Sequence, residues 1–250
     1  MLLVLIGLTL TACIVAADHT EPTPDTVLPR LLAVLKDRNP ELRRTAAQSL
    51  GKIASAKAVP ALASALRDPD TGVRRSAVWA LGMIGPEEFD WSPVMVLLFD
   101  SDPAVREAAG AALGRTGPNL AIVKFLNERI QEPGVTSDTK RLAAAALGGM
   151  EARSAVPLLT RLLLDRDPIV RRWAAAALGE IADPQTVGPL GALLRKDPDP
   201  GVRVEAAFRL GKFGGKAAEP ALISARKDAD ENVRRLVEAA LKELGSGVKS

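Results

Sequence analysis

The chain has 250 residues, with 33 Lys and Arg against 30 Asp and Glu, one His, one Cys and no Tyr. The single Cys excludes an intramolecular disulfide framework and a cysteine zinc cluster, and the single His excludes multi-histidine metal sites. A formal net charge of +3 is too small to indicate a nucleic-acid partner by itself. Only 3% of the residues are aromatic, and the abundance of Ala and Leu favours helices that pack closely through small side chains.

The first element in chain order is an uncharged, almost wholly apolar run from Leu2 to Ala17. It is shorter than the roughly 20 residues that a membrane span needs and is typical of the hydrophobic region of a secretory signal. The segment 10–13 (LTAC) resembles the lipobox of bacterial lipoproteins. The resemblance implies a signal peptide over 1–12, a diacylglycerol on the thiol of Cys13, and a mature protein held to a membrane by its acyl chains.

Alternatives to the lipid anchor stay open, because no Lys or Arg precedes the apolar run, whereas signal peptides normally begin with a positive segment. Ordinary signal cleavage after Val15 to Ala17 would give a soluble exported protein, and the remaining interpretation is an apolar tail with a chance Cys. If Cys13 is the lipid anchor, residues 13–26 form a polar, Pro-containing tether in which His19 is solvated.

From residue 27 the sequence repeats itself. Leu-Gly recurs at intervals of 31 to 34 residues, a cation stands eight residues before each glycine, and an Asp stands six residues before the cation in six of seven units. The glycine column is Gly51, Gly82, Gly114, Gly148, Gly179 and Gly211, with Lys242 in the seventh slot. The cation column is Arg43, Arg74, Arg106, Lys140, Arg171, Arg203 and Arg234. The Asp column is Asp37, Asp68, Asp100, Asp165, Asp197 and Asp228.

Two further columns keep the same phase. A second polar residue follows the Asp column by two positions: Asn39, Asp70, Asp102, Asp167, Asp199 and Asp230. Prolines recur near the start of the units: Pro29, Pro60, Pro93, Pro157, Pro189 and Pro220. Columns in such register predict seven repeats over 27–245, at about 27–53, 54–85, 86–117, 118–150, 151–181, 182–214 and 215–245, followed by a tail at 246–250.

Each unit is predicted to hold two helices. The first follows the recurrent proline, which is tolerated in a first helical turn, and an Asp-Pro turn ends it. The second runs from Val-Arg to Leu-Gly, where the glycine provides backbone freedom and close approach. In the fifth unit its apolar stripe is Val170, Ala174, Leu178 and Ile181. Because one unit cannot bury its stripe alone, the units must stack, and the predicted fold is all-α, a right-handed α-solenoid.

The motif Asp-x-Asp-x-x-Val-Arg-Arg-x-Ala-Ala-x-Ala-Leu-Gly has its best copy from Asp165 to Gly179 (DRDPIVRRWAAAALG). It closely resembles the HEAT-like repeats of the phycobilisome-lyase type, and the resemblance spans about residues 25–245. It implies the solenoid fold strongly and an activity only weakly, because such arrays serve many roles.

The Asp and cation columns have a structural interpretation. An Asp in the turn accepts N–H groups at the start of the next helix, and the Arg pairs with a carboxylate of its own or the adjacent unit. A ladder of such pairs would fix how one repeat sits on the next. We expect this role rather than ligand binding, because a catalytic residue would not recur in every repeat.

The fourth unit departs from the pattern. Gly134 stands where the Asp belongs, Lys140 replaces Arg, and Lys124 takes the place of the recurrent Pro in a first helix predicted over 121–131. A drifted repeat with a longer loop at 131–138 is expected. The alternative is a change of curvature or a flexible joint between repeats one to three and five to seven.

A second line of side chains faces outward from the second helices, opposite the apolar stripe. It comprises Arg44, Arg75, Trp79, Arg141, Arg172, Trp173, Phe208 and Arg235. In resembling solenoids the second helices line the concave surface, and Arg and Trp dominate binding hot spots. The hypothesis is a basic, partly aromatic groove that holds an acidic or extended protein segment. The alternative is that the arginines are solvated and the aromatic rings pack between repeats.

No catalytic site, cofactor, metal ion or nucleic acid is expected. Among resembling families, the phycobilin lyases attach chromophores, and the deoxyhypusine hydroxylases hold a di-iron centre through His-Glu pairs. This chain has no His within the repeats, so such an iron site cannot form. Resembling solenoids that bind damaged DNA use a basic concave face. The small net charge of this chain and its predicted export signal both argue against DNA binding. The acidic pairs of the turns lack the ligand spacing of an EF-hand.

The sequence therefore predicts a non-catalytic, protein-binding scaffold, anchored as a lipoprotein in the bacterial cell envelope. A soluble exported protein remains the alternative location. The alternative function is an accessory or lyase-like subunit that holds a tetrapyrrole or another substrate in the groove.

Overall fold

The computed structural model describes residues 24–85 and 89–246, and this part of the chain is all-helical. The predicted signal peptide, Cys13, residues 13–23 of the tether and the tail from 247 lie outside the described residues. The helices form seven pairs: α2 (Pro24–Val34) and α3 (Pro40–Ile53), α4 (Val59–Ala65) and α5 (Thr71–Ile84), α6 (Ser92–Val96) and α7 (Pro103–Leu113), α8 (Leu120–Arg129) and α9 (Ser137–Gly149), α10 (Val156–Leu162) and α11 (Pro168–Ile181), α12 (Val187–Lys196) and α13 (Pro200–Phe213), α14 (Gly215–Ser224) and α15 (Glu231–Ser246). Short 3-10 turns flank the first helices: η1 (Ala56–Ala58), η2 (Leu97–Phe99), η3 (Arg153–Ala155) and η4 (Pro184–Thr186).

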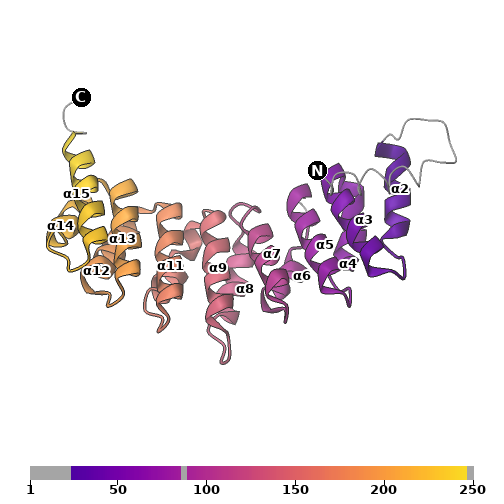
Figure 1. Cartoon of the computed structure of the whole chain (residues 1–250), viewed down its shortest axis with the longest axis horizontal. Helices are drawn as coiled ribbons and strands as arrows, with labels where there is room; N and C mark the ends of the chain where they lie inside the picture. The colour runs from indigo at the N-terminus through magenta and orange to yellow at the C-terminus, as the bar shows by residue number, and fades with distance from the viewer. Residues whose placement is uncertain (1–23, 86–88, 247–250) are drawn as a thin grey trace.

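The pairs stand side by side in a curved row from α2 at one end to α15 at the other (Figure 1). Each second helix packs on the second helix of the next pair, from α3 through to α15, whereas successive first helices touch far less. In an arc the more closely spaced row lies inside, so the second helices form the concave row and the first helices the outer one. The predicted α-solenoid is confirmed, while the handedness of its superhelix stays a prediction.

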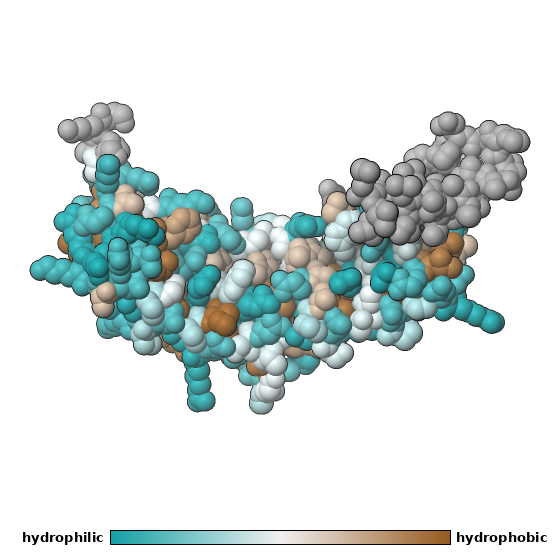
Figure 2. All heavy atoms as spheres, in the orientation of Figure 1, coloured by the Kyte–Doolittle hydropathy of each residue, from teal (hydrophilic) through white to brown (hydrophobic). Residues whose placement is uncertain are grey.

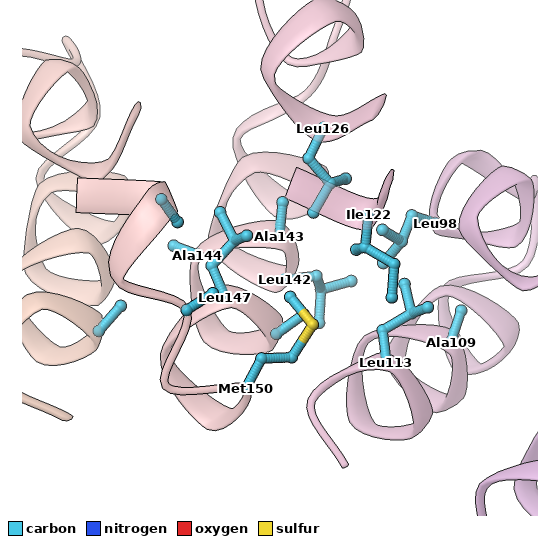
Figure 3. Packing of buried hydrophobic residues seen from close by; sticks show 14 of the residues in the cluster. Leu98, Ala109, Leu113, Ile122, Leu126, Leu142, Ala143, Ala144, Leu147 and Met150 are labelled. Carbon is cyan, nitrogen blue, oxygen red and sulfur yellow. The ribbon is translucent and has the colours of Figure 1, made fainter. Parts of the chain in front are cut away.

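One continuous, thin core of mostly Ala and Leu side chains runs through the row. Figure 3 shows it where the third and fourth pairs meet: Leu113 of α7, Ile122 of α8 and Leu142 of α9 point into a shared interior. The stripe predicted for the fifth repeat is buried along its whole length, from Val170 to Ile181. The core is therefore assembled between repeats rather than within them.

The glycine column lies where neighbouring second helices approach most closely. A Cβ on Gly51 would come within 2.8 Å of the Cα of Ala80, and one on Gly148 within 2.8 Å of the Cα of Ala177. Close approach is thus the reason for these glycines. Backbone freedom is not, because the left-handed residues stand three or four positions later: Gly85, Gly117 and Gly215, and also Ala54, Glu151 and Ala182.

Two of the recurrent prolines do not start their helix, contrary to prediction. Pro29 lies inside α2 and Pro220 inside α14, because each helix begins with an additional turn before its proline. That turn buries Leu28 in one helix and Ala218 in the other, and the buried apolar area offsets the hydrogen bond that proline cannot donate. Accordingly residues 24–26 belong to α2 rather than to the tether.

The cation and Asp columns meet between repeats, and we call this row of contacts the ladder. Each arginine reaches the aspartate of the following repeat: Arg43–Asp68 at 2.6 Å, Arg74–Asp100 at 2.9 Å, Arg171–Asp197 at 2.7 Å and Arg203–Asp228 at 2.8 Å. The direction is the same at every rung. Of the two partners that the sequence left open, the adjacent unit is the one that the structure uses.

Each ladder arginine also holds its own turn. Nη1 of Arg171 donates to the carbonyl oxygens of Asp165 (3.0 Å) and Arg166 (3.1 Å), while Nε and Nη2 bind the carboxylate of Asp197. Asp197 in turn accepts the N–H of Asp199, which caps α13. One guanidinium therefore ties the turn of its own repeat to the turn of the next, with nearly all of its donors used.

The ladder has two ends within the described residues. Arg234 of the last repeat binds the carbonyl oxygens of Asp228 and Ala229, and no carboxylate contact is seen for it in that part of the chain. Asp37 of the first repeat accepts the N–H of Asn39 at 2.8 Å.

The fourth repeat keeps its rungs through contacts that were not predicted from the sequence. Gly134 lies in the loop at a φ of 86°, and Asp138, in the first turn of α9, receives Arg106 at 2.7 Å instead. Lys140 reaches Asp165 at 2.7 Å through its single ammonium group. The helices are also further apart here, because a Cβ on Gly114 would lie 3.6 Å from Ala146. The repeat is a drifted unit with a longer loop, and a flexible joint stays a prediction.

We expect Arg171→Lys to lower the free energy of unfolding by about 1–2 kcal/mol, because one ammonium cannot replace a two-pronged carboxylate contact and two carbonyl contacts. The reciprocal change Lys140→Arg is expected to raise it by about 0.5–1 kcal/mol. Urea unfolding followed by circular dichroism measures both. Effects of the same sign for the two variants would contradict a positioning role for the ladder.

The ladder carboxylates also predict acid sensitivity. Burial alone would raise the pKa of the Asp68 carboxyl, but the hydrogen bonds from Arg43 and from the N–H of Asp70 outweigh it and hold this pKa below its ordinary value. The pKa is lowered in the same direction at four more ladder carboxyls: Asp100, Asp138, Asp165 and Asp228. A carboxyl with a depressed folded pKa contributes stability above its unfolded pKa of about 3.9, and this contribution is lost as the pH falls through the folded pKa.

We therefore expect the Tm to stay nearly level between pH 7 and about 5 and to fall steeply below about 4. In Asp228→Asn the Tm is expected to be lower at neutral pH but to fall less in acid, since one depressed carboxyl is gone. Thermal melts at a series of pH values measure this. If the Tm of the parent and that of the variant fall equally below about pH 4, the Asp228 carboxyl does not contribute to the acid sensitivity.

Candidate functional site: the concave face

The residues of the predicted groove all lie on second helices and so share the concave row. Arg75, Arg172, Trp173, Phe208 and Arg235 are exposed, whereas Arg44, Trp79 and Arg141 are half-buried. The structure thus brings them to one face of the molecule, spread from α3 to α15.

Arg75 and Trp79 line a cleft of about 570 Å³ between α3, α5 and α7. Gln48 and Lys52 of α3 form one side of it. Residues 104–111 of α7 form the other side, mostly through small side chains: Ala104, Glu107, Ala108 and Ala111. A volume of this size is ordinary for a ligand site. The sequence placed Trp79 and Arg75 on this face, but not the hollow between them and α7.

Several arginines of the outward line are occupied within the protein. Arg44 pairs with Glu41, and Arg235 donates to the side chain of Asn232. Arg172 lies 4.0 Å from Glu205 and is otherwise exposed. These three are lightly held, because Glu41 and Asn232 are exposed and the contact of the exposed Arg172 with Glu205 is long.

Arg141 is the exception, because it acts as a tie between repeats. Its Nη2 binds Glu107 of the preceding repeat at 3.0 Å and Asp138 at 2.6 Å. Burial disfavours its charge, but the hydrogen bonds to Glu107 and Asp138 outweigh this and raise the pKa of Arg141 above its ordinary value. Its guanidinium also lies 5.9 Å from the ring centre of Trp173. Arg141 therefore serves the fold at least as much as any groove.

The aromatic residues of the C-terminal half form a second feature. Trp173 is 38% exposed and Phe208 46% exposed. Arg209 lies over Phe208 at 5.4 Å, and it pairs with Glu205 at 2.7 Å and Glu180 at 3.9 Å. Each ring thus has an arginine over it, and each of these arginines also forms an ion pair with a carboxylate.

Arg209 was not among the residues predicted for the groove. It stands two residues before the column glycine, where the neighbouring repeats have Ala177 and Ala240, and its stem covers Gly179 so closely that a Cβ there would collide with it. The break in the alanine column was the available signal. It places a cation and its carboxylate partners at the base of this patch.

In the face that Figure 2 presents, hydrophilic residues predominate and hydrophobic ones form small separate patches. Across residues 24–85 and 89–246, no three metal-ligating side chains cluster together. None of the helices in that part of the chain combines the length and apolarity of a membrane span.

Comparison with known proteins is consistent with this architecture. The family model of HEAT repeats matches residues 28–89, 136–194 and 187–250. None of the curated proteins matches the chain.

Solved structures with TM-scores of 0.50 or more share the fold. The complex of CpcE and CpcF of the phycocyanin lyase from Nostoc sp. PCC7120 is similar with a TM-score of 0.50 and 25% identity, over 92% of this chain and 97% of that one. An engineered protein is similar with a TM-score of 0.52 and 22% identity, over 87% and 68% of the two chains. Human deoxyhypusine hydroxylase is similar with a TM-score of 0.46 and 24% identity, over 91% and 86%.

More than half of the chain is covered by the HEAT-repeat model, and the helix pairs, the ladder and the stacked core are those of such an array. The chain belongs to the HEAT-repeat family.

Proposed function

We propose that the protein is a non-catalytic scaffold that binds a protein partner along its concave face. The observation that carries the proposal is the set of exposed Arg, Trp and Phe side chains on the second helices: Arg75, Arg172, Trp173 and Phe208. Large aromatic rings and guanidinium groups supply most of the energy of protein interfaces. The exposed parts of these rings are available to a partner, which would bury apolar area that the chain itself leaves in contact with water.

The charge and shape of the face favour a protein segment over other ligands. The exposed cations are interspersed with carboxylates such as Glu107 and Glu205 rather than gathered into one basic patch. Nucleic acid demands many phosphate contacts, whereas a protein segment needs a few anchors with complementary charge.

We further propose that the scaffold works in the bacterial cell envelope, anchored through Cys13. The support is the apolar run from Leu2 to Ala17 together with the LTAC segment that ends at Cys13. One acyl chain binds a membrane only weakly, so stable anchoring needs the several chains of a processed lipoprotein.

The partner-binding prediction uses a variant that carries Arg75→Glu, Arg172→Glu, Trp173→Ala and Phe208→Ala, all at exposed positions. We expect capture of the partner from envelope extracts to fall about tenfold or more, because the hot-spot groups are gone. The control carries Val96→Glu and Ile223→Glu on the first helices, where the apolar side chains are more exposed than Trp173 and Phe208. Equal capture by the two variants, each with an intact helical spectrum, would contradict the proposal.

For the anchor, we expect Cys13→Ser to abolish incorporation of radiolabelled palmitate and to move the protein from the membrane fraction to the soluble one. The parent chain expressed in the same cells is the control. A parent that takes up no palmitate, with a variant that still sediments with membranes, would remove Cys13 as the anchor.

A second candidate function rests on the similarity to the phycocyanin-lyase complex. In that case the concave face would hold a tetrapyrrole or a related substrate for a partner enzyme. Absorbance of the purified protein separates the two functions. A visible band from a bound chromophore favours the lyase-like role, and a colourless sample that retains a protein partner favours the scaffold.

A further inference from the structure

The cleft between α3, α5 and α7 owes its shape to one large residue among small ones. The column three residues before the glycine holds Gln48, Trp79 and Ala111 in successive repeats. The indole of Trp79 packs over Gly51 on one side. On its other side α7 presents only Ala104, Ala108 and Ala111 beside Glu107, so space is left next to the ring.

The polar groups around this cleft differ in whether they are already bonded. The amide of Gln48 donates to Ser76 at 3.4 Å, and the carboxylate of Glu107 accepts from Arg141 at 3.0 Å. For Lys52 and Arg75, in contrast, no hydrogen bond or ion pair is seen anywhere in the described part of the chain. The cleft therefore combines an apolar wall with two cations, Lys52 and Arg75, that have no partner among the described residues.

The other aromatic patch lacks this combination. Around Trp173 and Phe208 the cations Arg172 and Arg209 already face Glu205, and Arg141 lies over the Trp173 ring. Among the concave residues described above, only those of the first three repeats combine an apolar hollow with cations that lack a partner in the described part of the chain.

We propose that this cleft is the anchoring site of the concave face, and that it takes a bulky apolar side chain of a peptide segment with acidic residues on both sides. The inference rests on the proposed scaffold function and adds the place and the chemistry of the occupant. The apolar side chain lies against Trp79 and the alanines of α7, and the carboxylates meet Lys52 and Arg75. Desolvating the ring supplies affinity, and the charges supply selectivity and speed of encounter.

A duplex or single strand of nucleic acid fits the cleft less well. Two cations neutralise few phosphates, and the apolar wall of alanines on α7 offers no partner to a charged backbone that runs through the hollow. Acidic residues flanking one large apolar side chain satisfy both the charge and the apolar wall.

The test uses the full chain in detergent and three fluorescein-labelled peptides, with anisotropy as the readout. The probe is the acetylated, amidated hexapeptide EEFLEE. The peptide KKFLKK reverses its charge, and EESSEE removes its apolar pair. We expect EEFLEE to bind about tenfold or more tightly than either, and its affinity to fall as salt is raised.

Matched variants locate the site. Arg75→Glu reverses a charge that has no partner among the described residues, and Ala111→Phe fills the hollow from an exposed position. Each is expected to weaken binding about tenfold or more. Their controls are Arg172→Glu, in the Arg75 column three repeats further along, and Ala176→Phe, in the Ala111 column two repeats further along. Neither residue lines the cleft, so both changes are expected to weaken binding of the hexapeptide far less than the two cleft variants do. Circular dichroism verifies that all four variants keep the parent's helicity.

The outcomes separate the anchor from the wider function. Loss of EEFLEE binding with Arg172→Glu instead of Arg75→Glu overturns the anchor and leaves a concave scaffold standing. Binding of all three peptides alike, or of none at millimolar concentration, also overturns it, whereas failure of the scaffold itself is read from partner capture. A dimer of the chain alone that Ala111→Phe disrupts, measured by analytical ultracentrifugation, would assign the cleft to a second copy and overturn the peptide proposal.

Discussion

One cationic side chain per rung, a guanidinium at every rung except that of Lys140, fixes the spacing of the array. Arg171 illustrates the constraint, because its three nitrogens hold the carbonyl oxygens of one turn and the carboxylate of the next at hydrogen-bonding distance. The distance between neighbouring turns is therefore set by the length of a single side chain. Removing such a group would leave a buried carboxylate such as Asp197 without its main partner, which is costly in a partly dry environment.

The thin core follows from the same spacing. Second helices held this close can meet only through small residues, so glycine faces alanine at Gly51 and Ala80 and again at Gly148 and Ala177. A core of one alanine-rich layer per repeat has no room for many large rings. The low aromatic content of the sequence and the partial exposure of Trp79, Trp173 and Phe208 are thus two results of one packing rule.

The repeat period, the helix pairs and the buried stripe of α11 could be predicted from the sequence, because they depend on local spacing. The ladder partners could not, since the columns alone do not decide whether Arg43 turns to Asp37 in its own unit or to Asp68 in the next. Asp138 escaped prediction because the lengthened loop moved it off the Asp column. The cleft beside Trp79 depends on Lys52 and Ala111, which meet only through the stacking of three helices distant in sequence.

The ladder also has a consequence for how such a chain changes its length. Every rung except Arg106–Asp138 joins the same two positions of neighbouring units, so a whole unit can be inserted or removed and the donors still find acceptors. A single residue added within a helix pair would instead rotate donor away from acceptor, and only turns such as 130–136 can absorb it. We therefore expect the length of such an array to change by complete repeats. Each added repeat extends the concave surface by one more set of side chains.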